Sequence, residues 1–347
     1  MLPVTVKASR AFAPGRVNLI GEHTDYNNGW ALTFALSEGV SVTTTPLSER
    51  IVRVTSTTAE GVDEFDPVQV DHRLGWRAYV RGCVAELSAE RIDIRGTEIV
   101  IDSDLPAAQG LSSSAALTLA LILALTDAAG HAPLPPLTAA RLAQRVEHDW
   151  AGSDCGLLDQ LAILHGAEGE ATVIDFEQET TRQVALDLKG HQLVLLSAGP
   201  RPATAQSAYN RRREECREAA YRMRLEYLRD ATITDLHMLP DELTGRARHV
   251  ISENGRVLNA VGALEQGAPE RLGMLLNQSH RSLRDDFELS TPEIEAAVGA
   301  LLEGGALGAR LIGGGFGGTI LALLAPGSPL PAGARAVLPA PGARLLP

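Results

Sequence analysis

Lysine is scarce in this chain. Of the 31 basic residues only Lys7 and Lys189 are lysines, and neither follows a G-x-x-x-x-G stretch. A P-loop requires its lysine at that place, where the ammonium group reaches the phosphates. The commonest phosphate-binding loop of nucleotide-binding proteins is therefore excluded. The same scarcity argues against a mechanism that passes through a lysine Schiff base.

Paired cysteines and long apolar runs are also missing. Cys83, Cys155 and Cys216 lie far apart and form no C-x-x-C pair, which argues against a structural zinc site and a disulfide framework and predicts a reducing compartment. The longest apolar run, residues 115–126, has 12 residues, whereas a membrane-spanning helix needs about 20. Because the first 15 residues contain no apolar stretch of signal-peptide length, we expect a cytoplasmic protein with no membrane partner.

Positive charge is in the minority. Acidic residues number 43 against 31 basic ones, so the formal net charge is −12, and this balance does not favour a nucleic acid or an anionic membrane as partner. Hydrophobic residues make up 45% and charged residues 21% of the chain, which is typical of a globular protein rather than a disordered one. At about 100–200 residues per domain, the 347 residues predict two domains.

Short strand-like runs and longer helical patterns together predict an α+β chain. The strand-like runs are residues 10–13, 31–35, 40–45, 51–56, 97–102, 171–175 and 192–197. A nearly all-apolar segment, residues 112–129, predicts a buried central helix, and residues 138–150 predict a second helix. Beyond residue 198 the sequence changes to charged helical segments. We therefore expect a first domain over residues 1–198 and a second over residues 199–347.

The second half has one clear helix start and one glycine cluster. Ser290 is followed by a proline in the first turn and by a glutamate three residues on, which predicts that it caps a helix over residues 291–302. Two apolar runs, residues 309–312 and 319–324, flank the glycine cluster and predict a paired hairpin. The tail from residue 326 is rich in proline and glycine and is expected to be irregular.

A dense polar segment lies between two strand-like runs near the N-terminus. Residues 13–29 read APGRVNLIGEHTDYNNG and carry Arg16, Glu22, His23 and Asp25 beside several glycines and asparagines. Carboxylates accept hydrogen bonds from the vicinal hydroxyls of a carbohydrate, and histidine and arginine complete such a set. The segment therefore predicts the wall of a sugar pocket, and a surface turn with ordinary caps is the alternative.

A glycine-containing loop runs directly into the apolar helix. Residues 105–116 read LPAAQGLSSSAA, so the first helical turn holds Ser112, Ser113 and Ser114. The first four N–H groups of a helix have no internal partner, and with the helix dipole they form an anion site. Simple capping by Ser112 is the alternative. Capping needs one serine, so three hydroxyls favour a phosphate cradle with one hydroxyl available to Mg²⁺.

Four acidic residues follow within a short span. Residues 147–160 read EHDWAGSDCGLLDQ and contain Glu147, Asp149, Asp154 and Asp159. Mg²⁺ usually takes one or two carboxylates plus substrate phosphates, and a carboxylate placed against a hydroxyl can accept its proton. The spacing does not say which carboxylate has which role. A solvated helix end is the alternative, and we expect it for Asp149.

Two further patterns are less specific. Residues 313–318, GGGFGG, match G-x-G-x-x-G, but a dinucleotide fold needs a helix next, and the residues that follow predict a strand. A glycine loop that lets the backbone approach a ligand remains. Trp76 and Tyr79, at i and i+3 of a helical segment, fit aromatic core packing, with a nucleobase stack as the alternative.

In this order the segments resemble the motifs of the GHMP kinases, the superfamily of galactokinase, homoserine kinase, mevalonate kinase and phosphomevalonate kinase. The matching stretches are GRVNLIGEHTDYN at residues 15–27, which resembles the galactokinase signature, GLSSSA at 110–115, CGLLDQ at 155–160 and GGGFGGT at 313–319. The resemblance implies a two-domain fold. Its N-terminal domain would be like domain 2 of ribosomal protein S5, its C-terminal domain ferredoxin-like, and the active site would lie between them.

The resemblance also implies a role for each matching residue. Asp159 would be the catalytic base, and Arg16 would offset charge at the reacting hydroxyl. The sugar would be held by Glu22, His23, Asp25, Gly156 and Tyr209. The phosphates and adenine of ATP would be held by Ala107, Gly110, Leu111, Ser112, Ser113, Trp76 and Tyr79, and Mg²⁺ by Ser114 and Glu147.

The activity implied by the resemblance is ATP-dependent phosphorylation of the anomeric hydroxyl of α-D-galactose, by a cytoplasmic monomer with Mg²⁺. Two alternatives stay open. One is a kinase for a related sugar, such as N-acetylgalactosamine or arabinose. The other is a non-catalytic sugar sensor, although sensors of this kind tend to have lost part of the serine motif, which is intact here.

Overall fold

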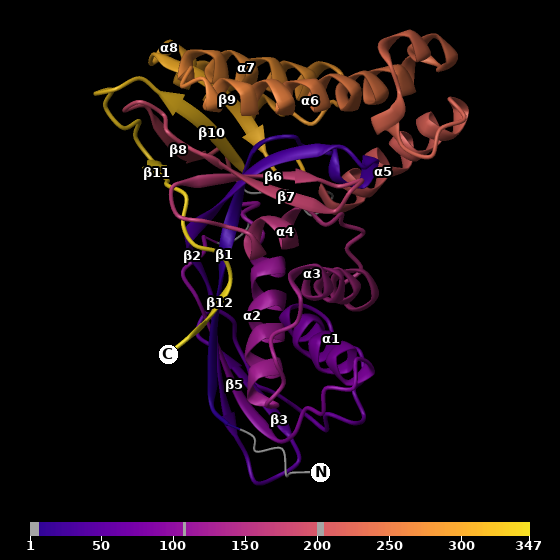
Figure 1. Cartoon of the computed structure of the whole chain (residues 1–347), viewed down its shortest axis with the longest axis vertical. Helices are drawn as coiled ribbons and strands as arrows, with labels where there is room; N and C mark the ends of the chain where they lie inside the picture. Colours follow the sequence, from indigo (N-terminus) through magenta and orange to yellow (C-terminus); the bar gives the residue numbers. More distant parts are fainter. Residues whose placement is uncertain (1–6, 107–108, 200–204) are drawn as a thin grey trace.

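The computed structural model describes residues 7–106, 109–199 and 205–347 and arranges them in two parts along its long axis (Figure 1). The lower part in Figure 1, which we call the first part, contains a large sheet with helices on one face. The upper part, which we call the second part, contains a smaller sheet beneath longer helices. The α+β class expected from the sequence is confirmed. Within the described ranges, no helix combines the length and the apolar character needed to cross a bilayer.

The larger sheet is built around two long antiparallel strands. β1 (Ser9–Ile20) and β2 (Trp30–Pro46) pair along most of their length, with register shifts between Pro14 and Arg16 and between Asn18 and Ile20, and residues 21–29 connect them. The other strands are β3 (Val52–Ser56), β4 (Asp63–Phe65), β5 (Thr97–Ser103), β6 (Glu170–Asp175), β7 (Thr180–Ala185) and β12 (Arg344–Leu346). Their order is β12-β1-β2-β5-β3-β4, with β6 paired to the start of β2 and β7 paired to β6. The long hairpin thus carries the polar segment into the upper part.

Helices cover one face of this sheet. They are α1 (Trp76–Ala89), α2 (Ser113–Ala128), α3 (Pro136–Arg145), the π-helical turn η2 (Val146–Trp150) and α4 (Leu158–Leu164). α2 lies at the centre, packs on β1, β2, α1 and α3, and is buried on nearly every side. This confirms the central helix predicted over residues 112–129. The helix predicted over residues 138–150 changes to π winding at Val146, because apolar periodicity reports buried faces and not the hydrogen-bond register.

The smaller sheet has the order β11-β8-β10-β9, and every pair in it is antiparallel. Its strands are β8 (Gln192–Ser197), β9 (Ala306–Ile312), β10 (Thr319–Leu324) and β11 (Ala334–Ala336). The helices around it are α5 (Ala205–Arg222), α6 (Asp241–Glu265), α7 (Pro269–Asp285) and α8 (Pro292–Glu303), with short 3-10 turns η3 (Leu228–Asp230) and η4 (Ile233–Met238). β9 and β10 confirm the predicted hairpin.

The two parts share an apolar core. One cluster of buried side chains joins Leu19 and Leu32 of the long hairpin to Val257 of α6 and Leu321 of β10. Packing of these side chains fixes how the two parts sit against each other. β8, which precedes the domain boundary predicted at residue 198, pairs with β10, which follows it. That boundary stays a prediction.

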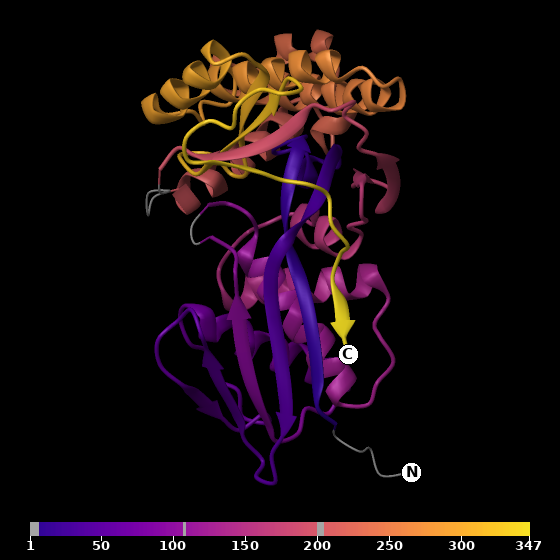
Figure 2. The ribbon, with the colours of Figure 1, turned by 90° about the vertical axis from the view of Figure 1, so that its left-hand side faces the viewer.

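The chain returns from the upper part to the lower after β11. The Val337 N–H donates to the carbonyl oxygen of Leu193 (3.0 Å), and the Ala340 N–H donates to that of Ala35 (2.9 Å). β12 then pairs with β1, and Figure 2 shows this last segment running down the molecule to the C-terminal residue. The tail expected to be irregular therefore contains two short strands. We call residues 337–343, which connect the two sheets, the strap.

The N-cap of α8 differs from the expectation. The Thr291 hydroxyl accepts a hydrogen bond from the Ile294 N–H (3.4 Å), whereas the Ser290 hydroxyl donates to Glu295. The prediction of Ser290 as the cap was wrong. With Thr291 as the cap, the proline that follows takes the first helical position, where its fixed φ fits best.

Candidate active site

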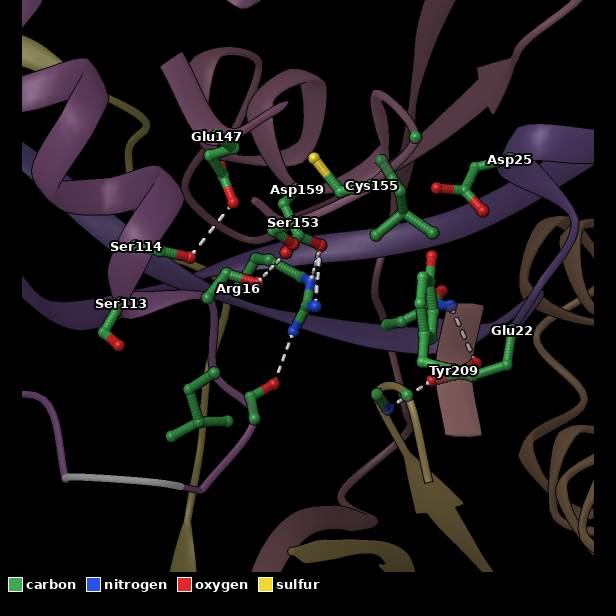
Figure 3. A pocket seen from close by; sticks show the side chains of 18 of the residues that line it. Arg16, Glu22, Asp25, Ser113, Ser114, Glu147, Ser153, Cys155, Asp159 and Tyr209 are labelled. Carbon is green, nitrogen blue, oxygen red and sulfur yellow. Dashed lines mark hydrogen bonds and ion pairs between the residues drawn. The ribbon is translucent and has the colours of Figure 1, made fainter. Parts of the chain in front are cut away.

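A cavity of about 410 Å³ opens where the two parts meet (Figure 3). Its walls come from the end of β1, the start of α2, α4 with the loop before it, α5 and the loop between β9 and β10. The lining residues include Arg16, Asn18, Glu22, His23, Asp25, Gln109, Gly110, Leu111, Ser112, Ser113, Ser114, Glu147, Cys155, Gly156, Asp159, Tyr209, Gly313 and Gly314. The four motifs found in the sequence therefore face one space.

Asp159 stands in the first turn of α4 and is held on both of its oxygens. The Arg16 guanidinium donates to Oδ1 through Nε (2.7 Å), and its Nη2 lies 2.6 Å from the same oxygen. The Ser112 hydroxyl donates to Oδ2. Arg16 also donates through Nη1 to the carbonyl oxygen of Gly110 (2.8 Å). One arginine therefore links this carboxylate to the loop before α2 (Figure 3).

The N-terminus of α2 is turned toward the cavity. Ser112 precedes the helix in the left-handed region (φ 62°), and its hydroxyl donates to Asp159 instead of capping the helix. The alternative of simple capping by Ser112 is therefore wrong. Ser113, Ser114 and Gly110 line the cavity beside this helix end. The positive end of the helix dipole and the first N–H groups thus face a space that suits an anion.

Glu147 lies on the π-helical turn, opposite the start of α2, with 4% of its surface exposed. The Ser114 hydroxyl donates to Oε2 (3.2 Å), and the Gln160 side-chain amide donates to Oε1 (2.9 Å). Burial, and to a smaller extent the negative charge of Asp159, raises the pKa of Glu147 to about 7. Both donors are neutral, so a cation from outside the chain can balance this carboxylate. The pair Glu147 and Ser114 therefore fits a hard metal ion.

Glu22 follows β1 and is 3% exposed. The Asn18 amide donates to its Oε2 (2.7 Å), the Arg310 guanidinium pairs with the same oxygen, and the Gly313 N–H donates to Oε1 (2.8 Å). Burial raises the pKa of Glu22 to about 7, even though Arg310 and the Gly313 N–H act to lower it. The arrangement fixes an acidic acceptor at the wall of the cavity.

Asp25 and Gly156 make a close approach across the cavity wall. A Cβ atom on Gly156 would lie 2.0 Å from Asp25 Oδ2, so only glycine leaves room for that oxygen. Asp25 begins the 3-10 turn η1 (Asp25–Asn27). Burial raises the pKa of Asp25 to about 6, and the charge of Asp159 contributes to the shift. The carboxylates of Asp25 and Asp159 are thus close enough to affect each other.

Aromatic rings surround His23 at the same end of the cavity. The His23 Nδ1 lies 2.6 Å from the Tyr26 hydroxyl oxygen. The centroid of its ring lies 5.2 Å from that of Tyr209 and 4.8 Å from that of Phe287. Since Tyr209 belongs to α5, the second part of the molecule contributes a hydroxyl to this end.

The glycine loop between β9 and β10 borders the loop before α2. The Thr319 hydroxyl donates to the carbonyl oxygen of Gln109 (2.8 Å). A Cβ atom on Gly313 would lie 3.4 Å from the carbonyl oxygen of Gly110, and Gly313 has a φ of +77°. The strand expected after this loop is confirmed as β10, so the loop does not open a dinucleotide-binding fold.

Most residues predicted for the site line this one cavity. They are Arg16, Glu22, His23, Asp25, Gly110, Leu111, Ser112, Ser113, Ser114, Glu147, Gly156, Asp159 and Tyr209. Trp76 and Tyr79 lie outside it, on α1, where they pack against the core of the first part. Burial raises the pKa of Tyr79 to about 12, and the nearby Ser114 side chain acts to lower it. Ala107 lies outside the described residues.

The remaining acids of the 147–160 segment are solvated. Asp149 and Asp154 are exposed, and Asp154 pairs with Arg213 (2.7 Å). The solvated helix end considered for this segment therefore applies to both of them, and the structure separates them from Glu147 and Asp159.

The sequence analysis missed four residues that hold the site together: Asn18, Gln160, Arg310 and Thr319. Asn18, Gln160 and Thr319 lie within the quoted motifs but carry no signal that distinguishes them from their neighbours. Arg310 is different, because it is the one charged residue of an apolar strand, ALGARLI. A charge in such a strand needs a buried partner, and that requirement could have identified it.

Models of three known protein families match the chain. Residues 78–167 match the GHMP kinases N terminal domain, residues 6–46 match the galactokinase galactose-binding signature, and residues 260–343 match the GHMP kinases C terminal domain. Together the matched stretches include all the cavity-lining segments except the start of α5.

Known proteins resemble this chain over most of its length. The galactokinase of Chloroflexus aurantiacus is 41% identical over 327 residues, which cover 91% of this chain and 83% of the relative. The crystal structure of Lactococcus lactis galactokinase complexed with galactose superposes with a TM-score of 0.91 at 32% identity, covering 99% of this chain and 96% of that one. Methanococcus jannaschii mevalonate kinase, 19% identical with a TM-score of 0.66 and coverage of 94% and 93%, shares the fold.

Without nucleotide or metal, Glu147→Gln is expected to stabilise the protein at pH 8 but not at pH 5. An acid whose pKa rises on folding holds its proton more tightly in the folded state. Wild type therefore loses stability as the pH rises from about 4.5, the ordinary value, to about 7. Glutamine removes the charge and keeps the shape. Urea unfolding in EDTA should show a gain at pH 8 of at most ~3 kcal/mol.

The exposed neighbour supplies the control for this measurement. Asp149→Asn should leave the free energy of unfolding nearly unchanged at both pH values, because an exposed charge costs little on folding. An equal effect of Glu147→Gln at pH 5 and pH 8 would contradict the raised pKa.

Proposed function

This chain belongs to the galactokinase family of GHMP kinases, and on that basis we propose that it transfers the γ-phosphoryl group of ATP to the C1 hydroxyl of α-D-galactose. The products are α-D-galactose 1-phosphate and ADP. One observation carries the proposal: Asp159 shares a single cavity with the N-terminus of α2 and with the acidic segment after β1. Phosphorylation of a sugar needs a proton acceptor, an anion site and acceptors for hydroxyls, and these three features supply them.

The sugar would lie at the end of the cavity formed by the segment after β1. Glu22 and Asp25 accept hydrogen bonds from vicinal hydroxyls, and His23 completes this wall. Gly156, which lies against Asp25, and Tyr209, whose ring lies beside that of His23, would complete the sugar site. The match of this segment to a galactose-binding signature supports galactose as the sugar.

Asp159 would act as the base. It accepts the proton of the C1 hydroxyl while that oxygen forms its bond to the γ-phosphorus and the bond to the leaving ADP oxygen breaks. Arg16 holds the carboxylate by two contacts to Oδ1 and offsets negative charge next to the reacting atoms. The N–H groups at the start of α2, with Ser112 and Ser113, cradle the phosphates and favour the charge that develops on them.

Glu147 and Ser114 would hold Mg²⁺ together with the phosphates of ATP. When bound, the ion supplies charge neutralisation for the phosphates. The neutral partners of Glu147 support this assignment, because binding a cation removes the cost of burying an unpaired carboxylate.

The proposal also covers the adenine site, the cellular location, the oligomeric state and the partners of the enzyme. Trp76 and Tyr79 are the candidates for adenine contact, and the closeness of Tyr79 to the Ser114 side chain supports a nucleotide lying toward α1. Ala107, Gly110 and Leu111 would complete the loop around the phosphates. We also propose a cytoplasmic monomer with no nucleic-acid or membrane partner, consistent with the net charge of −12.

An ADP-release assay with Mg-ATP and a panel of free sugars tests this function. We expect turnover of galactose to exceed that of N-acetylgalactosamine and arabinose. Faster turnover of either of these would assign a kinase for a related sugar. Galactose binding without ADP release would instead make the chain a sensor, and no binding of galactose at all would overturn the proposal.

Asp159→Asn is expected to lower kcat by roughly 10²–10⁴-fold, because asparagine cannot accept the proton. Galactose affinity, measured by calorimetry, should change by no more than about threefold, because the side chains that bind the sugar in the ground state are all kept. Asp149→Asn, an exposed acid of the same segment, is the matched control and should turn over normally. Near-normal kcat in Asp159→Asn would refute its role as the base.

Glu147→Gln is expected to raise the Mg²⁺ concentration that gives half-maximal rate by at least about tenfold, since it removes a charged ligand. The measurement is a Mg²⁺ titration of the rate at fixed ATP and saturating galactose. An unchanged titration curve would count against Glu147 as a ligand.

A further inference from the structure

Arg310 has the largest side chain among the fully buried ones of the described residues. It belongs to β9 and reaches the end of β1 and the acidic segment that follows it. Its Nη1 donates to the carbonyl oxygens of Asn18 (3.1 Å) and Leu19 (3.0 Å), and its Nη2 pairs with the carboxylate of Glu22. A buried guanidinium is costly unless its charge is paired and its N–H groups are bonded. All of these partners belong to the end of β1 and the residues that follow it.

An irregularity in β1 explains why Arg310 binds there. The register of β1 against β2 shifts between Asn18 and Ile20. A bulge of this kind bends the strand and takes backbone groups out of the ladder. Arg310 supplies hydrogen-bond donors to the two carbonyl groups at the bulge, which buried backbone requires. The direction of the bent strand end is thus fixed by a side chain of the second part.

The Glu22 carboxylate is held on both of its oxygens. Oε2 accepts from Asn18 (2.7 Å) and Arg310, and Oε1 accepts from the Gly313 N–H (2.8 Å). A carboxylate offers about four acceptor positions, so one position on Oε1 is left. Glu22 lines the cavity, and this position is available to a hydroxyl of a bound sugar.

The other buried polar groups nearby hold the backbone of the segment. Glu253 of α6 accepts from the Gly21 N–H (3.0 Å), and the His249 Nε2 lies 3.1 Å from the carbonyl oxygen of Glu22. Among the described side chains with a hydrogen bond to the Glu22 carboxylate, Arg310 is the cationic one. Orientation and charge of that carboxylate therefore depend on Arg310.

We propose that Arg310 is a positioning residue for the sugar: its ion pair holds the Glu22 carboxylate in one orientation, so that the remaining acceptor position faces a hydroxyl of the substrate. The inference rests on the proposed function and deepens it, because it extends the sugar site into β9. The Gly313 N–H fixes the other oxygen. The glycine loop between β9 and β10 thus serves the sugar through Gly313, and the residue that follows the loop, Thr319, contacts the loop before α2.

Arg310→Lys tests the proposal through the two Michaelis constants. Lysine keeps a positive charge but lacks the planar fork that serves carbonyls and a carboxylate at once. We expect KM for galactose to rise at least about tenfold. KM for ATP should stay within about twofold of the wild-type value, because the residues proposed to bind ATP are unchanged.

Arg246→Lys is the matched control. Arg246 is also buried in the second part and pairs with Glu215 (2.8 Å), but it lies away from the cavity. Its replacement should leave both Michaelis constants unchanged. A parallel rise of both constants in Arg310→Lys, or a fall of kcat alone, would mean that Arg310 only ties the two parts together, and the proposal would be overturned.

A double-mutant cycle tests whether Arg310 acts through Glu22. Glu22→Gln weakens galactose binding by itself. If the arginine works through this carboxylate, adding Arg310→Lys to Glu22→Gln should raise KM for galactose by much less than it does in wild type. Full multiplication of the two effects would show that Arg310 acts by another route.

A double variant keeps the test available if Arg310→Lys fails to fold. Should Arg310→Lys be unstable, Arg310→Met combined with Glu22→Gln removes both buried charges together. Its KM for galactose should equal that of Glu22→Gln alone, and a further rise would overturn the proposal. If the wild-type protein binds galactose without turnover, the proposed function is wrong but the role of Arg310 can still be tested. Calorimetry of galactose binding to wild type and Arg310→Lys would then decide that role.

Discussion

Four carboxylates, Glu22, Asp25, Glu147 and Asp159, face one cavity in which the described lining residues supply a single guanidinium, that of Arg16. The rest of the site can be understood from this imbalance. Burial raises the pKa of three of these acids to between about 6 and about 7, so the protein holds them at a cost in stability. Hydroxyls and a metal ion can relieve that cost, and the site is therefore completed by its ligands rather than by its own side chains.

The arrangement of the fold separates two tasks along the cavity. The long β1–β2 hairpin carries the acidic segment to the place where the two parts meet. There Arg310 of β9 and Gly313 of the glycine loop bind the Glu22 carboxylate. The start of α2 presents backbone donors and hydroxyls at the other end, beside Glu147. Asp159 and Arg16 lie between these ends (Figure 3) and are tied to the α2 end through Ser112 and Gly110. The reacting groups are thus held by regular elements that pack on a shared apolar core.

The sequence predicted the parts of the site whose signal is local. Three consecutive serines before an apolar segment located the start of α2, and the dense polar stretch around Glu22 located the sugar wall. What could not be predicted depends on contacts between distant segments. Ser112 adopts a left-handed conformation and donates to a carboxylate 47 positions away, and Arg310 pairs with a residue 288 positions away. The π winding at Glu147 changes hydrogen-bond register without changing the pattern of apolar residues.

The strap connects the two sheets a second time, after residues 186–191 have led from β7 of the larger sheet to β8 of the smaller one. Its hydrogen bonds reach β8 at Val337 and the first part at Gly342 and Ala343, whose N–H groups donate to the carbonyl oxygens of Gly166 (2.8 Å) and Ile163 (2.9 Å). A wide hinge opening would have to break these bonds and expose the core that they span. Ligands must therefore enter and leave through the opening of the cavity while the two parts stay bonded to each other. The motion that admits them is confined to side chains and loops around that opening.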